Sequence, residues 1–354
     1  MTAPIRTAPA QRTGILLMNL GSPDSTEVGD VRTYLQEFLM DGRVIDAPWP
    51  IRYLIVHGFV LPFRPAKSAE AYRTIWTPEG SPLIVMSRRV QRLLQERIPQ
   101  PVELAMRYRL PRVDGALQAL QNQGVEEVVL IPLFPHYAMS SYESAVEEVR
   151  RCIREHFPDL KLKICPPYYR HPAYLEALAA TVSPHLATPW DHLLISFHGI
   201  PERHLRKSDP TRSHCLKAAS CCDRPHSAHT TCYRHQCHAT AAGLVEKAGL
   251  PPGKVSVSFQ SRLGRDAWIQ PYTEPELERL ARSGVRRLKV LCPAFVSDCL
   301  ETLEEIAVRG REVFQHHGGE ELELIPCLND HSRWIDALVE LARETAEGTV
   351  PQPA

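Results

Sequence analysis

Short apolar runs alternate with longer amphipathic stretches along almost the whole chain. We predict strands at the apolar runs, which cover residues 14–20, 103–108, 127–133, 160–165, 193–198, 255–259, 287–292 and 322–326. Helical spacing of apolar residues follows most of them, for example at 140–157 and 300–316. Strand followed by helix, repeated, is typical of parallel sheets that are covered on both faces.

Similar motifs in the two halves of the chain indicate a duplicated structural unit. Residues 17–23 (LMNLGSP) line up with residues 195–201 (ISFHGIP), and the GV pair that opens 124–134 is matched by the one that opens 284–295. The alternative is the general likeness of buried strands, but two matches in the same order favour duplication.

We therefore expect an α/β fold of two similar domains, each a four-stranded parallel sheet flanked by helices. The first domain should cover residues 14–180 and the second residues 181–346. Residues 1–13 are expected to be a disordered tail, and residues 347–354 a second tail.

Composition narrows the class of protein. The chain has 354 residues, and its 41 basic and 41 acidic side chains cancel, so no global field would attract nucleic acid. The N-terminal stretch is polar and lacks the apolar run of a signal peptide. We therefore expect a cytoplasmic, reducing environment.

Cysteines are concentrated in one segment. Five of the ten cysteines lie within 23 residues, at Cys215, Cys221, Cys222, Cys232 and Cys237, and five histidines are interleaved with them. Disulfides, zinc or an iron–sulfur cluster would each explain this density. In a reducing compartment clustered thiols bind metal more readily than they form disulfides.

Parallel sheets bind ligands at the carboxyl ends of their strands, and this rule selects a few polar residues. His198 ends a predicted strand, where an imidazole could accept a proton or ligate a metal; a structural hydrogen bond is the alternative. Glu301 and Glu305, four residues apart, should share one helical face and repel each other unless they bind a cation or a proton. The helix dipole alone explains Asp298.

Residues 45–63 (IDAPWPIRYLIVHGFVLPF) form a broken apolar stretch. It is too interrupted to span a bilayer, which takes about 20 predominantly apolar residues. A lid over an apolar ligand, or a patch that touches a membrane surface, fits better than an ordinary buried helix. No G-x-G-x-x-G spacing follows the first strand, which argues against a nucleotide cofactor.

Several long motifs together closely resemble the ferrochelatase family, in the family's order, from residue 14 to about residue 342. They are GILLMNLGSP at 14–23, MRY at 106–108, SFHGIP at 196–201, SFQSRLG at 258–264, Trp268, and SDCLETLEE at 297–305. The resemblance implies two Rossmann-like, chelatase-like domains and the insertion of Fe²⁺ into a porphyrin to make heme. The apolar stretch favours protoporphyrin IX as the substrate.

Alternatives to this reaction stay open. Coproporphyrin III could be the substrate, or the metal could be cobalt or nickel with a different tetrapyrrole. A non-catalytic protein that binds a tetrapyrrole and senses redox state through its cysteines would not need His198 or the Glu301–Glu305 face.

The resemblance also implies roles for individual residues. His198 would take protons or bind iron, and Glu301 would face it across the porphyrin, with Glu305 and Asp298 as relay positions. The residues that match substrate contacts are Leu20, Arg64, Tyr72, Ser81, Arg107, Tyr108, Ser261 and Trp268. Residues 45–63 match the apolar lip of the family's pocket, with peripheral membrane contact as a further expectation.

Some bacterial members of the family resemble this chain in carrying an internal cysteine-rich insertion that holds a [2Fe–2S] cluster. The resemblance therefore implies such a cluster in residues 214–238, with four thiolate ligands. We expect Cys215, Cys222, Cys232 and Cys237, with Cys221 as the alternate and zinc as the alternative metal.

The chain departs from the family pattern at two places. Phe134 stands where members of the family often have tyrosine, so no role of that hydroxyl carries over. Cys299 stands where some members have histidine, so no metal role carries over to it.

Overall fold

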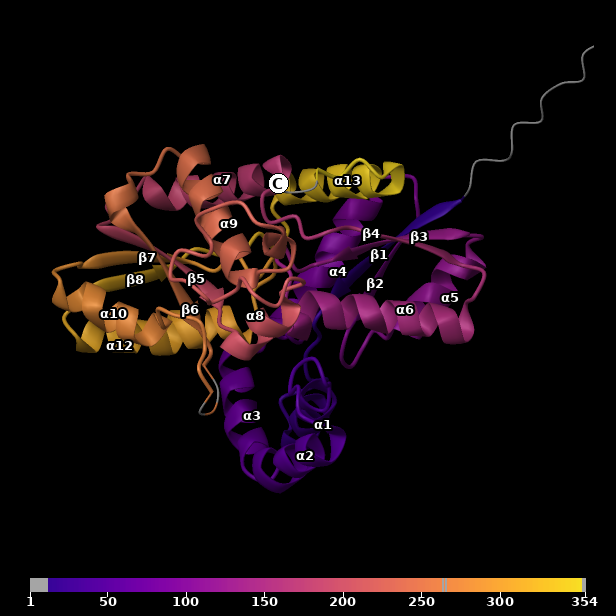
Figure 1. Ribbon diagram of the computed structural model, residues 1–354, viewed down its shortest axis with the longest axis horizontal. Helices are drawn as coiled ribbons and strands as arrows, with labels where there is room; N and C mark the ends of the chain where they lie inside the picture. Colours follow the sequence, from indigo (N-terminus) through magenta and orange to yellow (C-terminus); the bar gives the residue numbers. More distant parts are fainter. Residues whose placement is uncertain (1–11, 263, 265, 352–354) are drawn as a thin grey trace, which may run out of the picture.

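The fold consists of two four-stranded parallel sheets side by side (Figure 1). The computed structural model describes residues 12–262, 264 and 266–351; of the expected tails, residues 1–11 and 352–354 lie outside the described residues, whereas Thr13 opens the first strand and Glu347 ends the last helix. The strands are β1 (Thr13–Asn19), β2 (Val102–Met106), β3 (Glu127–Pro132), β4 (Lys161–Ile164), β5 (His192–His198), β6 (Val255–Gln260), β7 (Arg287–Leu291) and β8 (Glu321–Leu324).

Both sheets have the same strand order. It is β2-β1-β3-β4 in the first and β6-β5-β7-β8 in the second, with every neighbouring pair parallel. The central strands are buried along almost their whole length, because helices cover both faces. The predicted α/β class of two similar four-stranded units is confirmed.

The helices form an inner and an outer layer on the two sheets. The helical elements of the first half are α1 (Val28–Leu39), α2 (Trp49–Tyr53), η1 (Leu54–Val60), α3 (Arg64–Ile75), α4 (Pro82–Gln95), α5 (Val113–Asn122), η2 (Met139–Glu143), α6 (Ser144–His156) and α7 (Pro172–Leu186). Those of the second half are α8 (Glu202–Ser208), η3 (Ser227–Thr230), α9 (Tyr233–Lys247), η4 (Pro252–Lys254), α10 (Thr273–Arg282), α11 (Leu300–Leu303), η5 (Glu305–Gly310), α12 (Arg311–His316) and α13 (Ser332–Glu347). One continuous core joins α4, α7, α9 and α13 to both sheets, whereas α5 with α6, and α10 with α12, cover the outer faces.

Two helices of the inner layer are exchanged between the halves. Helix α7 packs on α9 over the second sheet, although it follows the first sheet in sequence. The final helix, α13, packs on α4, β3 and β4 of the first sheet. The boundary expected at residue 180 falls inside α7.

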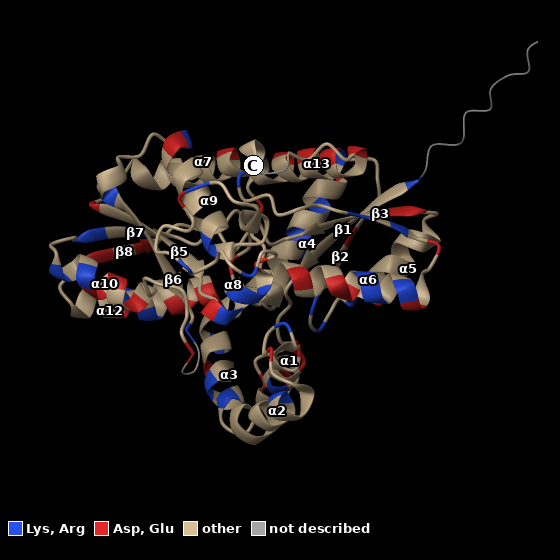
Figure 2. Ribbon diagram, in the orientation of Figure 1, with Lys and Arg blue, Asp and Glu red and all other residues tan. Residues whose placement is uncertain are grey.

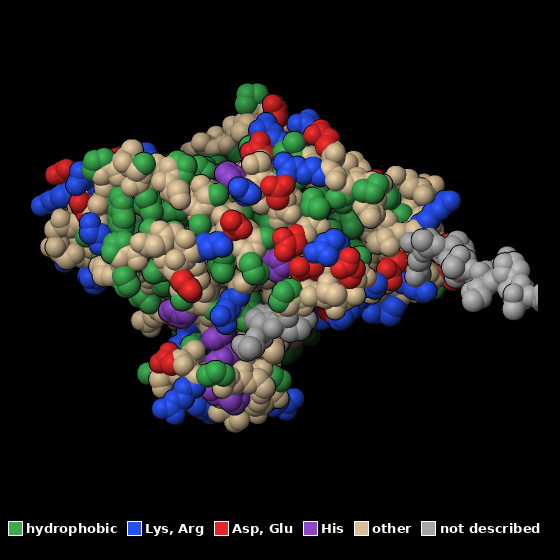
Figure 3. Space-filling view, turned by 90° about the horizontal axis from the view of Figure 1, so that it is seen from above, with side chains coloured by type: hydrophobic (Ala, Val, Ile, Leu, Met, Phe, Trp, Pro, Cys, Tyr) green, Lys and Arg blue, Asp and Glu red, His purple; other side chains and the backbone are tan. Residues whose placement is uncertain are grey.

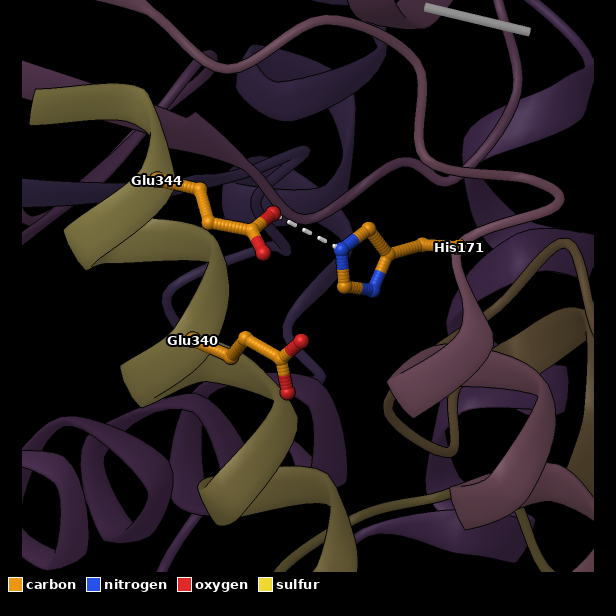
Figure 4. A group of neighbouring side chains, drawn as sticks. All are labelled: His171, Glu340 and Glu344. Atoms are coloured by element: carbon orange, nitrogen blue, oxygen red, sulfur yellow. Dashed lines mark hydrogen bonds and ion pairs between the residues drawn. The ribbon is translucent and has the colours of Figure 1, made fainter. Parts of the chain in front are cut away.

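A buried histidine pins the two exchanged helices together. Nε2 of His171, which precedes α7, lies 3.0 Å from a carboxylate oxygen of Glu344 on α13, and Glu340 lies one turn earlier on the same face (Figure 4). The three side chains are close enough to share a cation. However, Nδ1 of His171 is buried without a partner among the described residues, whereas a metal-bound imidazole normally donates its second N–H. We therefore assign the contact to helix packing.

Helices α1 to α3 and the π-helix η1 project from the first half as a separate hairpin-like layer, which we call the lip (Figure 1). Its own small core contains Val31, Tyr34, Val56 and Tyr72. The tip is poor in charge (Figure 2), and its outward side chains Trp49, Leu54, Phe59 and Phe63 are between 60% and 76% exposed. Among the described helices, none is both long and apolar enough to cross a bilayer.

Candidate active site

A large cavity lies between the lip and the carboxyl ends of both sheets. Its volume is about 1340 Å³, above the ~300–1,000 Å³ of most ligand pockets. Leu20 follows β1, His198 ends β5, Ser261 follows β6, and Trp268 lies in the loop after it; all four line the cavity. Three residues that the strand-end rule selected, Leu20, His198 and Ser261, therefore line one cavity, and the lip supplies its apolar wall.

His198 is held in one tautomer by its own backbone. Its Nδ1 lies 2.6 Å from the carbonyl oxygen of Gly199, and a carbonyl can only accept, so Nδ1 carries the proton of the neutral ring. Nε2 then keeps its lone pair. The ring lies against Trp268 and Phe295, with ring centroids 6.5 and 6.1 Å away. The imidazole is thus arranged to accept a proton or bind a cation through Nε2.

Gly199 is required at this turn because a side chain has no room. A Cβ built on it would lie 2.8 Å from the carbonyl oxygen of Gln260 and 3.2 Å from the Trp268 ring. The Gln260 carbonyl belongs to the backbone of β6, so it could move only by distorting the strand. The glycine of the SFHGIP motif therefore fixes the close approach of β5 to β6.

Glu301 and Glu305 both line the cavity, but they do not lie on a regular α-helix. Helix α11 ends at Leu303, and the π-helix η5 begins at Glu305. Extra-wide turns of this kind are frequent at functional sites, because they re-aim side chains. The expected shared face holds, in that both carboxylates face the same cavity.

Ser261 holds the carboxylate of Glu305. Its backbone N–H donates at 2.8 Å and its hydroxyl donates to the other oxygen. Ser261 has φ +68°, which is uncommon for a residue with a side chain. Burial raises the pKa of Glu305, the Ser261 hydrogen bond and the nearby His198 act to lower it, and Glu301 raises it further. On balance the pKa of Glu305 is raised, so its carboxylate binds a proton more readily than that of an exposed glutamate.

Two phenols lie near Glu301 in the same cavity. Tyr34 and Tyr72 are buried, with ring centroids 6.4 Å apart and edge to face. Burial raises the pKa of each phenol well above its ordinary value, and the Glu301 charge raises it further. Both therefore stay protonated, and their hydroxyls hydrogen-bond to each other near Glu301.

The other residues predicted to contact substrate fall into two groups. Arg64 and Ser81 line the cavity, and Arg64 has no ion-pair partner among the described residues. Arg107 and Tyr108 lie behind its wall instead: Arg107 pairs with Asp41 at 2.7 Å, and the Tyr108 hydroxyl donates to the same carboxylate at 2.9 Å. They brace the end of α1.

Asp298 also lies outside the residues that line the cavity. Its oxygens accept hydrogen bonds from Asn329 Nδ2 at 2.6 Å, the Thr302 hydroxyl at 3.0 Å and the Cys327 N–H at 3.3 Å. This carboxylate ties the loop after β8 to the start of α11, and a negative charge just before α11 also suits the N-terminus of a helix.

Comparison with known proteins identifies the class of this site. The model of the ferrochelatase family matches residues 12–346. The ferrochelatase of Stutzerimonas stutzeri is 57% identical over 329 residues, which cover 92% of this chain and 96% of that protein. The ferrochelatase of Azotobacter vinelandii is 55% identical over 331 residues, covering 93% and 98%.

The chain belongs to the ferrochelatase family. It is an enzyme that inserts iron into a porphyrin to make heme, as the motif resemblance implied. Among solved structures, SirB from Bacillus subtilis with Fe³⁺ matches with a TM-score of 0.54 at 14% identity, covering 97% of this chain and 100% of that one. The SirB complex with cobalt has the same score at 11% identity. These two matches support the fold.

The cysteine-rich segment of this ferrochelatase lies between α8 and α9. The carboxylate of Asp209 accepts backbone N–H bonds from His214 at 2.8 Å and Cys215 at 2.9 Å, which folds the segment back on itself. The thiols of Cys215 and Cys222 both contact that of Cys232. Cys237 is buried one turn further along α9.

Arg234 lies among these sulfurs. Its guanidinium donates to Cys222 Sγ at 3.4 Å and to Cys221 Sγ at 3.5 Å. Such donors stabilise thiolate over thiol, and contact with Cys232 lowers the pKa of Cys215. Contact with neighbouring thiols, in contrast, raises the pKa of Cys222 and Cys232, and burial raises that of Cys237, so Arg234 offsets only part of the cost of anionic sulfur here.

Three contributors to this ferrochelatase site were missed in the sequence. Gln260, the last residue of β6, donates to the carbonyl oxygen of Glu301 at 2.7 Å and accepts from Ser196. Asp46 joins the lip to Arg203 and Lys207 of α8. Tyr34 is the third. The strand-end rule could have found Gln260; Asp46 and Tyr34 gain their partners only through the tertiary fold.

Proposed function

We propose that this ferrochelatase binds protoporphyrin IX in the cavity beneath the lip and inserts Fe²⁺ between His198 and the Glu301–Glu305 pair. The observation that carries the proposal is the hydrogen bond from His198 Nδ1 to the Gly199 carbonyl, because it leaves Nε2 free as the acceptor. Glu301 and Glu305 line the same cavity and supply carboxylates for a hard divalent cation.

The chemistry balances with these groups. Two pyrrole N–H bonds break and four Fe–N bonds form while Fe²⁺ gives up water ligands, so the macrocycle releases two protons as the metal enters. His198 Nε2 accepts protons from the porphyrin, and Glu305, whose pKa is raised by burial, passes them outward. Asp298 is a proposed relay position behind Glu301, and Arg107 and Tyr108 contribute by bracing the wall.

The apolar lip favours protoporphyrin over coproporphyrin III, because vinyl groups gain more from apolar contact than extra propionates do. Leu20, Tyr72, Trp268 and Ser81 would contact the ring, and the unpaired Arg64 would meet a propionate.

Visible spectroscopy of metallation tests this function. With Fe²⁺, the enzyme should convert protoporphyrin IX faster than coproporphyrin III. His198→Ala should abolish turnover while porphyrin still quenches tryptophan fluorescence, because the cavity walls remain. Near-normal iron insertion by His198→Ala would overturn the assignment, and faster conversion of coproporphyrin III would overturn the substrate.

We also propose a [2Fe–2S] cluster in residues 214–238, held by Cys215, Cys222, Cys232 and Cys237. The contacts among the thiols of Cys215, Cys222 and Cys232, and the donation from Arg234 to Cys222 Sγ, support this ligand set. Zinc fits less well: its four ligands lie within about 4 Å of one another, and no three cysteine or histidine ligand atoms of the described residues gather that tightly. When bound, the cluster would supply one-electron redox chemistry.

Protein purified under argon should contain iron and acid-labile sulfide and show visible absorption bands. Cys222→Ser should lose both, whereas Cys221→Ser and the remote Cys152→Ser should keep them. Stoichiometric zinc without sulfide would contradict the cluster. If Cys221→Ser lost iron and sulfide but Cys222→Ser kept them, Cys221 rather than Cys222 would be the ligand.

The exposed apolar tip of the lip is proposed as a peripheral membrane contact. Trp49, Leu54, Phe59 and Phe63 point outward, and an amphipathic surface of this kind gains free energy by entering the headgroup region. On the face of the molecule in Figure 3, by contrast, basic and acidic side chains are interspersed.

A further inference from the structure

A buried tyrosine of the cysteine-rich segment touches the backbone of the catalytic histidine. Tyr233 is 5% exposed, and its hydroxyl donates to the carbonyl oxygen of His198 at 2.9 Å. A carbonyl oxygen can only accept, so the phenol is the donor, and this bond ties the first turn of α9 to the end of β5.

This bond acts on the peptide that determines the tautomer of His198. The carbonyl that accepts from Tyr233 belongs to the peptide joining His198 and Gly199. The next carbonyl along, that of Gly199, accepts from His198 Nδ1. The N–H of the His198–Gly199 peptide donates to the carbonyl oxygen of Gln260 at 2.7 Å, so this peptide is held on both sides, by Tyr233 and by Gln260. Tyr233 thereby fixes the acceptor that keeps Nε2 unprotonated.

The cysteine-rich segment in turn places Tyr233. Tyr233 is the first residue of α9 and directly follows Cys232, whose thiol contacts Cys215 and Cys222. Gln236, in the same first turn, donates to the carbonyls of His229 at 3.2 Å and Thr230 at 3.0 Å. It also accepts from the backbone N–H of Tyr137 at 2.6 Å. The fold of the segment thus sets the position of the first turn of α9.

We propose that Tyr233 is a positioning residue through which the cysteine-rich segment holds His198 with Nδ1 protonated and Nε2 free toward the cavity. The proposal rests on the role of His198 given above, and it assigns the segment a mechanical part in catalysis. Tyr233 itself acts through the His198–Gly199 backbone.

Tyr142 provides a matched control. It is also buried, at 8% exposure, and its hydroxyl donates to a backbone carbonyl, that of Cys165, at 2.7 Å. Tyr142→Phe therefore removes the same kind of bond from a place that does not touch His198. A purely structural contribution would be shared by both variants.

The test compares Tyr233→Phe with Tyr142→Phe in the full-length protein. For Tyr233→Phe we expect kcat to fall about tenfold with the KM for porphyrin within about twofold, because His198 is displaced while the cavity is kept. ¹⁵N-histidine NMR without substrate, with His198 assigned from a His198→Gln sample, should show a single Nδ1–H tautomer in the wild type and a mixture in Tyr233→Phe. Tyr142→Phe should keep the wild-type kcat and the single tautomer, with a similar drop in Tm.

A double-mutant cycle tests the link to the segment. Gln236→Ala should lower kcat in the wild-type background and have no further effect in Tyr233→Phe, because both act through one contact. The inference is overturned if Tyr233→Phe keeps the wild-type kcat and tautomer, if Tyr142→Phe loses as much kcat, or if the two effects multiply. Absence of iron insertion by the wild type would instead overturn the proposed function, and the NMR comparison would still decide the inference.

Discussion

Ser261 combines two features that are separable by mutation: an uncommon backbone conformation and a hydroxyl that holds Glu305. In the αL region a residue with a Cβ carries a cost of roughly 1 kcal/mol that glycine avoids. The hydroxyl, by donating to the carboxylate, lowers the pKa of Glu305 against the effect of burial. The serine is thus retained for its hydrogen bond rather than for its fit to the backbone.

Ser261→Ala and Ser261→Gly should therefore share one effect and differ in another. Both lose the hydroxyl, so the pKa of Glu305 rises and the carboxylate form needed to accept protons is reached only at higher pH. The acid limb of the pH–kcat profile should move to higher pH in both variants, with kcat at pH 7 lower by about three- to tenfold. Ser261→Gly should be more stable than Ser261→Ala by about 1 kcal/mol in urea unfolding, because glycine relieves the αL cost that alanine keeps. An unmoved acid limb would show that Ser261 does not govern the proton relay.

The site residues that could be predicted from the sequence are those that stand at a recognisable place in the chain, at the end of a strand or at the start of a helical segment. His198 and Ser261 follow or end strands, and Glu301 and Glu305 open a helical segment after a strand. Arg107 and Tyr108 sit at an equivalent strand end, yet they turn away from the cavity toward Asp41. A position directly after a strand determines where the backbone lies, but not where the side chain points. The direction of the Arg107 side chain depends on Asp41, more than 60 residues away in sequence. The spacing of apolar residues does not indicate such distant partners.

At the scale of elements, the strands were predictable to within one or two residues, because buried parallel strands are continuous apolar runs. The helix expected at 300–316 is instead α11, η5 and α12 in succession. The π-helix directs Glu305 toward Ser261. The spacing of apolar residues in this segment is that of an α-helix, so it did not predict this change of helix type.

The lip exposes several large apolar side chains that do not belong to its own core. Liposome flotation should recover the protein with vesicles, and Phe59→Glu combined with Phe63→Glu should abolish recovery, since each charge would have to enter the headgroup boundary. Leu110→Glu is a matched control: Leu110 is 56% exposed but lies outside the lip. Equal loss in the control, or no flotation of the wild type, would exclude the lip as a membrane contact.

At the scale of the whole molecule, Asp46 clasps the lip to the second half across the mouth of the cavity. Its carboxylate accepts from Arg203 and Lys207 of α8, and the ring of His204 is 3.5 Å away. Although burial acts to raise it, these donors lower the pKa of Asp46 to about 2 from its ordinary value of 3.8. A carboxyl with a lowered pKa stabilises the fold above its unfolded pKa and loses that contribution as the pH falls through the folded one.

Asp46→Asn should therefore lower the free energy of unfolding by about 1 kcal/mol at pH 6. The difference from wild type should be constant above about pH 5 and shrink as the pH falls from 4 to 2, as measured by urea unfolding at each pH. Asp336→Asn, which removes an exposed partner of Arg97, should cost less than about 0.5 kcal/mol. A wild-type advantage that grew below pH 4 would contradict the clasp.

The exchange of α7 and α13 has a consequence for how the chain is made. The first sheet is complete once β4 has been synthesised at residue 164, yet one helix of its inner cover, α13, begins only at residue 332. During that interval, the part of its inner face that α13 will cover has no native partner. The His171–Glu344 pin closes last of all. The two halves therefore cannot complete their cores one after the other during synthesis, in spite of their matching plans, because the inner face of the first sheet lacks α13 until almost the whole chain has been made.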